Sequence, residues 1–461
     1  MTPQHSPRLC VLVGLCVLAT AACSDDGPST TSDSAVETST STGDGDGDLT
    51  GDGDGEATGD GDGEATGDGD GDVPMEDPCT FLWEQTEMKV NGQVHAAYAI
   101  SVGDNGDFVA AGAIDDDPDD DLWFAKFDED GNKVWEQTID DGGGYDFASG
   151  VVLDNNGDLY VIGSLGGGAN KDLWLSKRSG ADGSELWAVS EVSQFEGDNE
   201  PGDIVLGPQG KLYASGTIRA GDDDTDVWLA KIEPADGSTI WTSSYSGQVD
   251  GAGFSIDRGS NLAVNAQGQV FVGGVEGIDF ETRDAIVLAY GPDGGAEQWR
   301  IAPQANPDPH IHSLSAITAG ADGEVYFVVY KSSGDWGFTL YRANGSGDVE
   351  WTLTEQDFVY AATDNWTVNG LSLSRDGSHL TIGGNLRAEE IGQGIDWSEV
   401  WVANISFSGQ GQCIASHTWQ NDKIIPASTY GYGFDEAPQG TIAVGEIRNG
   451  PQNYLWWGGY R

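Results

Sequence analysis

A segment that reads as a strand, a glycine-containing turn and a second strand recurs along most of this chain. It is clearest at residues 172–187, DLWLSKRSGADGSELW, and close versions occupy residues 121–135 and 226–241. The tryptophan of the second strand recurs at Trp83, Trp135, Trp187, Trp241, Trp299 and Trp351, with spacings of 52, 52, 54, 58 and 52 residues. A period near 50 residues is typical of propellers and other repeat arrays, so this spacing constrains the fold more than any other feature.

Each repeat also carries a tight turn with a glycine at one fixed place. These glycines are Gly106, Gly157, Gly210, Gly268, Gly323, Gly377 and Gly440. Glycine adopts a positive φ at such a hairpin position without a Cβ clash. Apolar residues alternate before the turn, after it and in a third run such as LWLSKRS, as half-buried antiparallel strands require. Each repeat therefore predicts three strands followed by the tryptophan strand.

The count of strands predicts a closed ring. The repeats supply seven triplets and seven tryptophan strands, because a seventh unit begins near Ile414, where the tryptophan is lost or shifted to Trp419. The region begins with a lone tryptophan strand at 81–87 and ends with a triplet at Arg461. An open solenoid would leave the first and last strands without partners. We therefore predict an all-β fold for residues 79–461, a seven-bladed β-propeller of four-stranded antiparallel blades whose last blade is closed by the N-terminal strand.

The N-terminus has the pattern of an export signal. Residues 1–8 are polar and basic, and residues 9–22 are apolar but too few to span a bilayer as a permanent helix. The run ends in LATAAC, which resembles a bacterial lipobox, although Thr20 stands where leucine is usual. We therefore expect residues 1–22 to be a lipoprotein signal peptide and Cys23 to carry the lipid. An ordinary cleaved signal, in which Cys23 is incidental, is the alternative.

Residues 23–78 predict a disordered acidic tether. Between Ser24 and Pro78 there are 18 acidic residues and no lysine or arginine, with repeats of TGDGDGEA. Such a segment buries too little apolar surface to fold, and about 55 flexible residues span roughly 40 Å. The whole chain has a formal net charge of −57. This charge argues against a nucleic-acid partner and favours cations or basic partners.

The repeat pattern resembles that of a known class of proteins. Residues 148–187 combine G-V-x-x-D-x-x-G-x-x-Y-V-x-G, then D-x-W-x-x-K, then G-x-x-x-W. This pattern is similar to the bacterial β-propeller repeat lipoproteins and, more distantly, to pyrroloquinoline-quinone-type propeller blades. The resemblance covers residues 79–461 and implies the fold. It implies little about function, because this fold hosts enzymes, binding proteins and scaffolds.

Loop lengths predict one regular face and one variable, acidic face. The connections after the second and fourth strands are long, and binding residues concentrate on such loops. Clustered carboxylates suit Ca²⁺, which takes six to eight oxygen ligands. The candidate calcium ligands are Asp115, Asp116, Asp117, Asp119, Asp121, Asp222, Asp223 and Asp224. A solvated acidic loop is the alternative, whereas Asp121, Asp172, Asp226 and Asp284 recur before the third strand and fit a structural role.

Three further sets of residues have open alternatives. His310 and His312 lie on one side of a predicted strand and are candidate transition-metal ligands, or a plain surface pair. Trp366, Trp397 and Trp419 are candidate platforms for sugars or peptides, with packing in the core as the alternative. Cys79 and Cys413 could form a disulfide in an oxidising compartment if their strands lie close enough.

No catalytic motif points to a reaction. The sequence has no G-x-S-x-G, H-E-x-x-H, P-loop or C-x-x-C. The leading hypothesis is a lipid-anchored protein of the cell envelope, at the outer membrane, whose propeller binds an unknown protein or glycan through its acidic loops without catalysis. An extracellular carbohydrate-active enzyme with carboxylates at the mouth of the central channel is the alternative, and an envelope-assembly scaffold is a third.

Overall fold

The computed structural model describes the repeat region in segments. These are residues 81–88, 95–115, 120–140, 144–166, 172–191, 199–221, 224–247, 255–277, 283–303, 312–331, 337–357, 366–390, 395–407, 411–417, 428–449 and 452–460. The predicted signal peptide, Cys23 and the predicted tether lie outside the described residues and stay predictions. No helix in these segments is long and apolar enough to cross a membrane.

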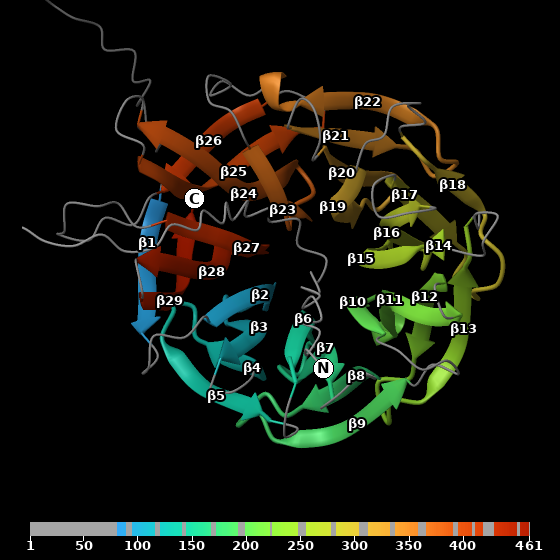
Figure 1. Cartoon of the computed structure of the whole chain (residues 1–461), viewed down its shortest axis with the longest axis horizontal. Helices are drawn as coiled ribbons and strands as arrows, with labels where there is room; N and C mark the ends of the chain where they lie inside the picture. The colour runs from blue at the N-terminus through green and yellow to red at the C-terminus, as the bar shows by residue number, and fades with distance from the viewer. Residues whose placement is uncertain are drawn as a thin grey trace, which may run out of the picture. The chain divides into compact units, whose positions relative to one another are not determined.

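Seven four-stranded blades form a ring (Figure 1). The innermost strands are β2 (His95–Val102), β6 (Phe147–Leu153), β10 (Glu200–Leu206), β15 (Arg258–Val264), β19 (His312–Ala319), β23 (Trp366–Leu373) and β27 (Ser428–Ala437). The second strands are β3 (Phe108–Asp115), β7 (Leu159–Leu165), β11 (Leu212–Gly221), β16 (Val270–Gly277), β20 (Val325–Lys331), β24 (His379–Glu390) and β28 (Gly440–Asn449). The third strands are β4 (Asp120–Phe127), β8 (Asp172–Arg178), β12 (Asp224–Ile232), β17 (Arg283–Tyr290), β21 (Gly337–Ala343), β25 (Ile395–Ser406) and β29 (Gln452–Tyr460). The outermost strands are β5 (Lys133–Ile139), β9 (Glu185–Glu191), β13 (Thr239–Tyr245), β18 (Trp299–Ile301), β22 (Val349–Thr354), β26 (Gly411–His417) and β1 (Phe81–Met88).

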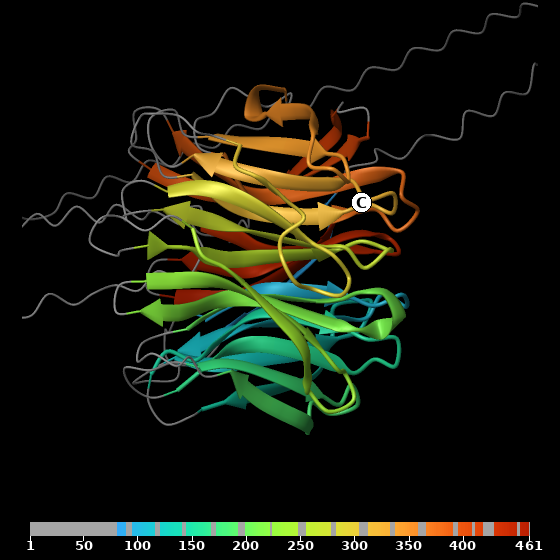
Figure 2. The same ribbon diagram turned by 90° about the vertical axis from the view of Figure 1, so that its right-hand side faces the viewer.

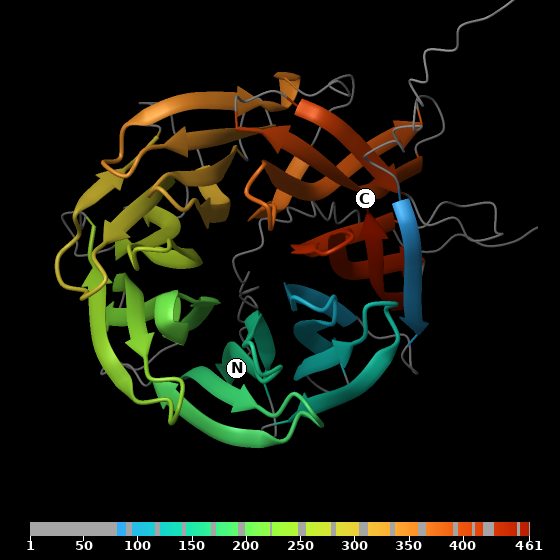
Figure 3. The same ribbon diagram turned by 180° about the vertical axis from the view of Figure 1, so that it is seen from behind.

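The ring closes as the strand count predicted. β1 pairs antiparallel with β29, so the outermost strand of blade 7 comes from the start of the repeat region (Figure 3). The blades are numbered 1 to 7 from β2 to β29. One short extra strand, β14 (Ser255–Ile256), pairs in parallel with β12 of blade 3. The predicted seven-bladed all-β fold is confirmed.

The repeated glycines do what the sequence predicted. All seven glycines of the first hairpins have positive φ, from 66° at Gly210 to 141° at Gly440. L-residues with a side chain avoid this region, which explains why the turn position is glycine in every blade.

The two faces of the ring differ in their connections. The turns between first and second strands and between third and fourth strands gather at one face, here called the turn face (Figure 2). The other connections leave from the opposite face, the loop face. Three blades depart from the predicted long second-to-third connection, and in blade 3 only two residues separate Gly221 from Asp224. In blade 6 the twelve-residue strands β24 and β25 pair from His379↔Ser406 to Glu390↔Ile395, and in blade 7 only two residues separate Asn449 from Gln452.

The hydrophobic core lies between blades rather than within them. The buried apolar residues of the described segments fall into seven clusters, and each cluster joins two neighbouring blades. Strand alternation explains this arrangement, because successive side chains point to opposite faces of a sheet. In β3, for example, Phe108 packs toward blade 7 and Val109 toward blade 2. Each contact between neighbouring blades is called a seam below.

The repeated tryptophan packs at the outer edge of five seams, against a turn glycine of the next blade. The Trp135 indole Nε1–H of blade 1 donates to the Gly180 carbonyl of blade 2 at 3.1 Å, and its ring lies against Gly183. Trp187 donates to Pro234 O at 3.0 Å, and Trp299 donates to Gly345 O at 2.9 Å. The indole of one blade therefore packs against the glycine in the second turn of the next blade. The most conspicuous residues of the sequence are structural.

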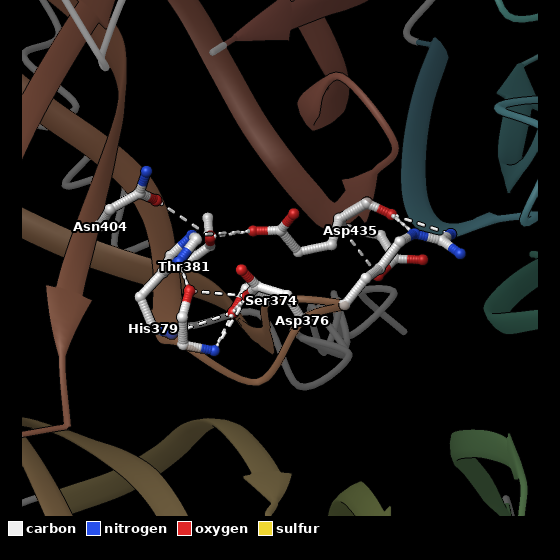
Figure 4. A network of polar contacts seen from close by, with 9 residues as sticks. Ser374, Asp376, His379, Thr381, Asn404 and Asp435 are labelled. Atoms are coloured by element: carbon white, nitrogen blue, oxygen red, sulfur yellow. Dashed lines mark hydrogen bonds and ion pairs between the residues drawn. The ribbon is translucent and has the colours of Figure 1, made fainter.

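A polar network reinforces the turn face where blades 6, 7 and 1 meet (Figure 4). The Arg375 guanidinium of blade 6 binds Asp104 of blade 1 at 2.5 Å and donates to the carbonyls of Val102 and Glu436. The Asp435 carboxylate of blade 7 accepts the Val102 N–H at 2.8 Å. A second set of hydrogen bonds joins Ser374, Asp376, His379, Thr381, Asn404 and Glu436. These contacts tie three blades together beside the closing strand.

Replacing Gly183 by alanine is expected to destabilise the ring. A Cβ there would lie 2.6 Å from Gln137 Cγ and 2.9 Å from the Trp135 ring, at a φ of +75°. We expect the free energy of unfolding to fall by about 2–4 kcal/mol, from the positive φ and the clash together. Gly377→Ala is the matched control, because φ is +68° and nothing lies within 4 Å of its Cβ. Urea unfolding of both variants measures the difference. An equal loss in the free energy of unfolding for both would contradict the packing of the Trp135 indole against Gly183.

Candidate functional site

A polar residue stands at the start of the inner strand in five blades, at the loop face. It stands eleven residues before the glycine of the first turn and is His95, Asp146, Asn199, Asp257 or His312 in blades 1 to 5. The last four are at most 3% exposed. Asp146 accepts the Gly166 N–H, and Asn199 accepts the Arg219 N–H, both at 3.1 Å. Sequence reasoning missed this position, although its fixed distance from the turn glycine was a signal.

The aspartate that begins the third strand faces this position across the seam. At the seam between blades 4 and 5, His312 Nδ1 lies 3.6 Å from Asp284 Oδ1. At the seam between blades 3 and 4, Asp257 lies against the start of β12, because its N–H donates to Thr225 O at 3.1 Å. Here an acid, Asp226, faces another acid rather than a histidine. The repeat thus builds the same junction with different charges.

The seam between blades 3 and 4 gathers four carboxylates. Asp224 and Asp226 come from β12, Asp257 follows β14, and Glu276 ends β16. Asp257 is fully buried, and its Oδ2 accepts the Gly247 N–H and the Ser255 hydroxyl, the latter at 2.9 Å. Among the described residues, buried Oδ1 atoms of Asp224, Asp226 and Asp257 have no hydrogen-bond donor. We call these four residues the seam cluster.

Burial and mutual repulsion raise the pKa values in the seam cluster. Burial, followed by the charges of Glu276 and Asp226, raises the pKa of Asp257 to about 6. Burial and the charge of Asp224 raise the pKa of Asp226 above its ordinary value. A buried carboxylate that faces other carboxylates favours its protonated form, or a cation beside it.

A tyrosine and an arginine border the seam cluster. The Tyr245 hydroxyl donates to Glu276 Oε2 at 2.5 Å, and the Arg300 guanidinium lies 3.1 Å from the same oxygen. Arg300 therefore compensates Glu276, whereas Asp226 and Asp257 face each other. The arrangement can hold a proton or attract a cation. It does not present a nucleophile beside a base.

The turn face has the opposite charge arrangement. Its acids lie beside lysines of the same blade, as Lys177 does with Asp154 at 3.2 Å and Asp158 at 3.3 Å. Lys126 lies 3.5 Å from Asp107, and Lys211 lies 2.5 Å from Glu233. These pairs use three of the 20 basic residues of the chain, and at the loop face Arg258 pairs with Glu200 and Arg300 with Glu276.

The predicted calcium ligands are only partly described. Asp116, Asp117, Asp119, Asp222 and Asp223 lie outside the described residues. Asp115 pairs with Asp120 in the β3–β4 ladder, but its side chain is not described. Asp121 is 8% exposed in β4, and Asp224 belongs to the seam cluster. Within the described segments, no three His, Cys, Asp or Glu side chains are grouped so that they could hold a metal ion.

The histidine pair is likewise divided. His310 lies outside the described residues, and His312 is buried against Asp284 of the neighbouring blade. The location of His312 inside a seam does not match a surface pair. Its described partner is a carboxylate that joins two blades.

The candidate aromatic platforms separate in the structure. Trp366 begins β23, is 2% exposed and packs edge-on against Trp401 at 4.8 Å between ring centroids. This is the core-packing alternative, since the indole has no exposed face for a sugar. Trp397 lies in β25 opposite Ala388, and its side chain is not described. Trp419 lies outside the described residues.

The predicted disulfide is not addressed by the described residues. Cys413 lies in β26 opposite Asn404, with its side chain not described, and Cys79 precedes the first described segment. The pairing of the two cysteines stays a prediction.

Replacing Asp257 by asparagine is expected to stabilise the protein at neutral pH. The pKa of Asp257 is raised to about 6, so the stabilisation by its proton is complete below about pH 4 and is lost as the pH rises through 6. Asparagine keeps the shape without the charge. We expect the variant to exceed the wild type by about 1–2 kcal/mol at pH 7.5 and to match it near pH 4.

Chemical unfolding at both pH values measures this difference. Asp182→Asn is the control, because hydrogen bonds from Ser184 lower the pKa of this exposed carboxyl and predict no gain at pH 7.5. A destabilised Asp257→Asn variant at pH 7.5 would show that the carboxylate charge is compensated in the folded protein.

Comparison with known proteins supports the fold. No protein-family model matches the sequence, and no curated protein matches it. Among solved structures, the polysaccharide lyase Uly1 is similar with a TM-score of 0.51 at 11% identity, over 82% of this chain and 99% of that one.

Two further structures are similar at lower scores. BamB from Moraxella catarrhalis has a TM-score of 0.41 at 12% identity, over 82% of this chain and 99% of that one. Quinohemoprotein alcohol dehydrogenase from Comamonas testosteroni has a TM-score of 0.43 at 8% identity, over 83% and 76%. Likeness at such identities bears on architecture and not on activity. The chain is therefore a seven-bladed β-propeller repeat protein.

Proposed function

We propose that this protein is a cell-envelope lipoprotein whose propeller binds a partner through its acidic loop face without catalysis. In this proposal Cys23 carries the lipid that holds the chain at the outer membrane. Residues 23–78 act as the tether, and the rigid ring presents the loop face to a basic protein or a glycan. The resemblance of LATAAC to a lipobox and the composition of the tether support the anchoring part.

The proposal that the loop face binds a partner rests on the different distribution of charge on the two faces. On the turn face, lysines lie beside the acids, as in the Lys177–Asp154 pair. In the seam cluster, Asp226 and Asp257 face each other on the loop face, and their pKa values are raised. A surface that keeps carboxylates together without a cation is arranged for a cationic partner or a bound metal ion.

The proposal includes Ca²⁺ as an ion that bridges the loop face and the bound partner. The acidic segments with Asp115–Asp121 and Asp222–Asp224 begin and end at strands of the loop face. Oxygen-rich segments of this kind suit Ca²⁺, which could link the loop face to an acidic partner as well as to a neutral one.

A carbohydrate-active enzyme is the second candidate. One observation favours it, namely that the raised pKa of Asp257 is about 6, which is the range expected of a general acid. The polysaccharide lyase Uly1 shares the fold, which shows that a propeller of this kind supports such a reaction. Release of products from a polysaccharide panel would favour this candidate over the binding protein.

The loop face is tested by paired variants in crosslinking experiments. Asp224→Asn with Asp226→Asn changes the loop face, and Asp154→Asn with Asp158→Asn changes the turn face by the same charge. We expect the turn-face variant to crosslink the same proteins as the mature wild type in similar amounts. The loop-face variant should crosslink at least about tenfold less of them, since the attraction is electrostatic. Equal capture by both variants would overturn the proposed surface. Capture that disappears in EGTA and returns with Ca²⁺ supports the calcium bridge, and capture unchanged by EGTA removes it.

The anchor is tested by replacing Cys23 with serine. Expressed in a bacterium with an outer membrane, the wild type is expected in the membrane fraction with an acyl-dependent mobility shift. The Cys23→Ser variant is expected to lose the shift, because a thioether-linked lipid requires the cysteine sulfur. Cys16→Ser, within the apolar run, is the control that should behave as the wild type. A membrane-bound Cys23→Ser chain without the shift would contradict lipid anchoring.

A further inference from the structure

Two tyrosines meet on the innermost strands where blade 7 adjoins blade 1. Tyr98 of β2 stands between Ala97 and Ala99, where the pairing with β3 shifts register, and Tyr432 of β27 stands at the same kind of shift. Their ring centroids lie 5.7 Å apart at an interplanar angle of 57°. The same register shift recurs in the inner strand of every blade, so the bulge belongs to the repeat. Blades 7 and 1 differ from the others in having a tyrosine at this position.

A buried carboxylate lies beneath the tyrosines with one oxygen unused. Glu446 of β28 is 1% exposed, and its Oε1 accepts the Tyr432 hydroxyl at 2.5 Å and the Arg448 Nε–H at 2.9 Å. Arg448 Nη2 donates to the same oxygen at 2.5 Å. Glu446 Oε2 is buried and has no donor among the described residues.

The surroundings combine an aromatic surface with donors and acceptors. Tyr98 is half-buried, and the Arg448 side chain is 42% exposed, so both reach the surface beside the buried Glu446. Blade 7 also has only two residues between β28 and β29, as few as blade 3 has between β11 and β12. The cluster of Tyr98, Tyr432, Glu446 and Arg448 is called the tyrosine cluster below.

We propose that the tyrosine cluster is a subsite for an uncharged sugar residue of a glycan. This inference rests on the proposed binding function and names the class of ligand at one place on the ring. A sugar supplies acceptors for Arg448 and an apolar C–H face for the Tyr98 ring. Glu446 positions the Arg448 guanidinium, because its Oε1 accepts hydrogen bonds from Arg448 Nε and Nη2. Aromatic side chains with a polar end suit ligands that have both apolar and polar surfaces.

Local charge selects a neutral ligand over an ionic one. The Arg448 guanidinium offsets the Glu446 carboxylate, so a bare cation would meet a positive group at the same site. Asp120 lies close enough to act on Tyr98 electrostatically, and with Glu446 it disfavours uronates and sulfated sugars. A ligand with hydroxyl groups and no charge avoids both penalties.

The tyrosines serve as hydrogen-bonding groups rather than as bases. Burial, with the nearby charge of Glu446, raises the pKa values of Tyr98 and Tyr432 well above the ordinary value for tyrosine. Both side chains therefore keep their protons at neutral pH. A phenol that keeps its proton binds a sugar hydroxyl but does not abstract a proton from a sugar ring.

Calorimetric titration of the mature chain with hexasaccharides tests the subsite. The neutral probes are hexamers of β-1,3-glucan, cellulose, xylan, mannan and chitin, and the charged probes are hexamers of alginate and polygalacturonate. We expect at least one neutral hexamer to bind and the charged ones to bind at least about tenfold more weakly. Tyr98→Ala and Glu446→Gln are each expected to weaken binding about tenfold, because stacking is lost in the first variant and the carboxylate that positions Arg448 is lost in the second.

Tyr326→Phe and Glu350→Gln are the matched controls. They change a tyrosine and a glutamate that lie beside Arg342 in blade 5, with the Arg342 guanidinium 5.7 Å from the Tyr326 ring centroid and 3.2 Å from Glu350 Oε2. Binding should stay within about twofold of wild type. Circular dichroism and the unfolding temperature establish that each variant is folded, and Tyr98→Phe provides a milder change if Tyr98→Ala does not fold. No binding of any neutral hexamer, preference for the charged hexamers, or equal effects of the two pairs of variants would overturn the subsite. None of these results affects the crosslinking test of the loop face, which uses other residues.

Discussion

The contact between neighbouring blades is the interaction on which this structure depends. No blade has a core of its own, because the buried side chains of each sheet pack against the sheets before and after it. In five blades an indole on the outermost strand adds to the contact by packing against a turn glycine of the next blade, as Trp135 does against Gly183. Burial of apolar surface at seven seams stabilises the ring as a whole, and a single blade outside the ring would leave both of its faces exposed to water.

Closure of the ring follows from the same dependence. If the first and last blades did not meet, two apolar sheet faces would be exposed. Strand β1 supplies the outermost strand of blade 7, and Arg375 reaches across blade 7 to Asp104 of blade 1. The junction that joins the ends of the repeat region is therefore reinforced on its outer edge and on its turn face.

The seams have the same strand positions in contact, but the side chains at those positions differ at the loop face. The residue that begins an inner strand faces the aspartate that begins the third strand of the preceding blade. Where that residue is His312 the pair is of opposite charge, and where it is Asp257 the pair is of like charge. The backbone is thus the same at each of these junctions, and a single change from histidine to aspartate replaces an ion pair by two carboxylates that repel each other. Every inner strand also has a bulge at the corresponding place, and the residue on that bulge varies, with tyrosine in blades 7 and 1.

The sequence alone determined the fold, the number of blades, the closing strand and the sign of φ at the turn glycines. These features are repeated seven times, and each copy reports the same local requirement, so a period and a turn position suffice to predict them. The candidate sites were less visible. Trp366 carries no local mark that separates a platform from a core residue, and its burial against Trp401 depends on strands that are 35 residues apart in sequence.

Only the tertiary structure brought Asp226 to Asp257 and Tyr98 to Tyr432, because these pairs join different blades across a seam. The sequence specifies each blade by local patterns, but the facing of side chains between blades depends on the packing of whole sheets. Tyr98 and Tyr432 lie near opposite ends of the repeat region and become neighbours only when the ring closes. The sequence therefore determined the scaffold, and ring closure decided which residues form its sites.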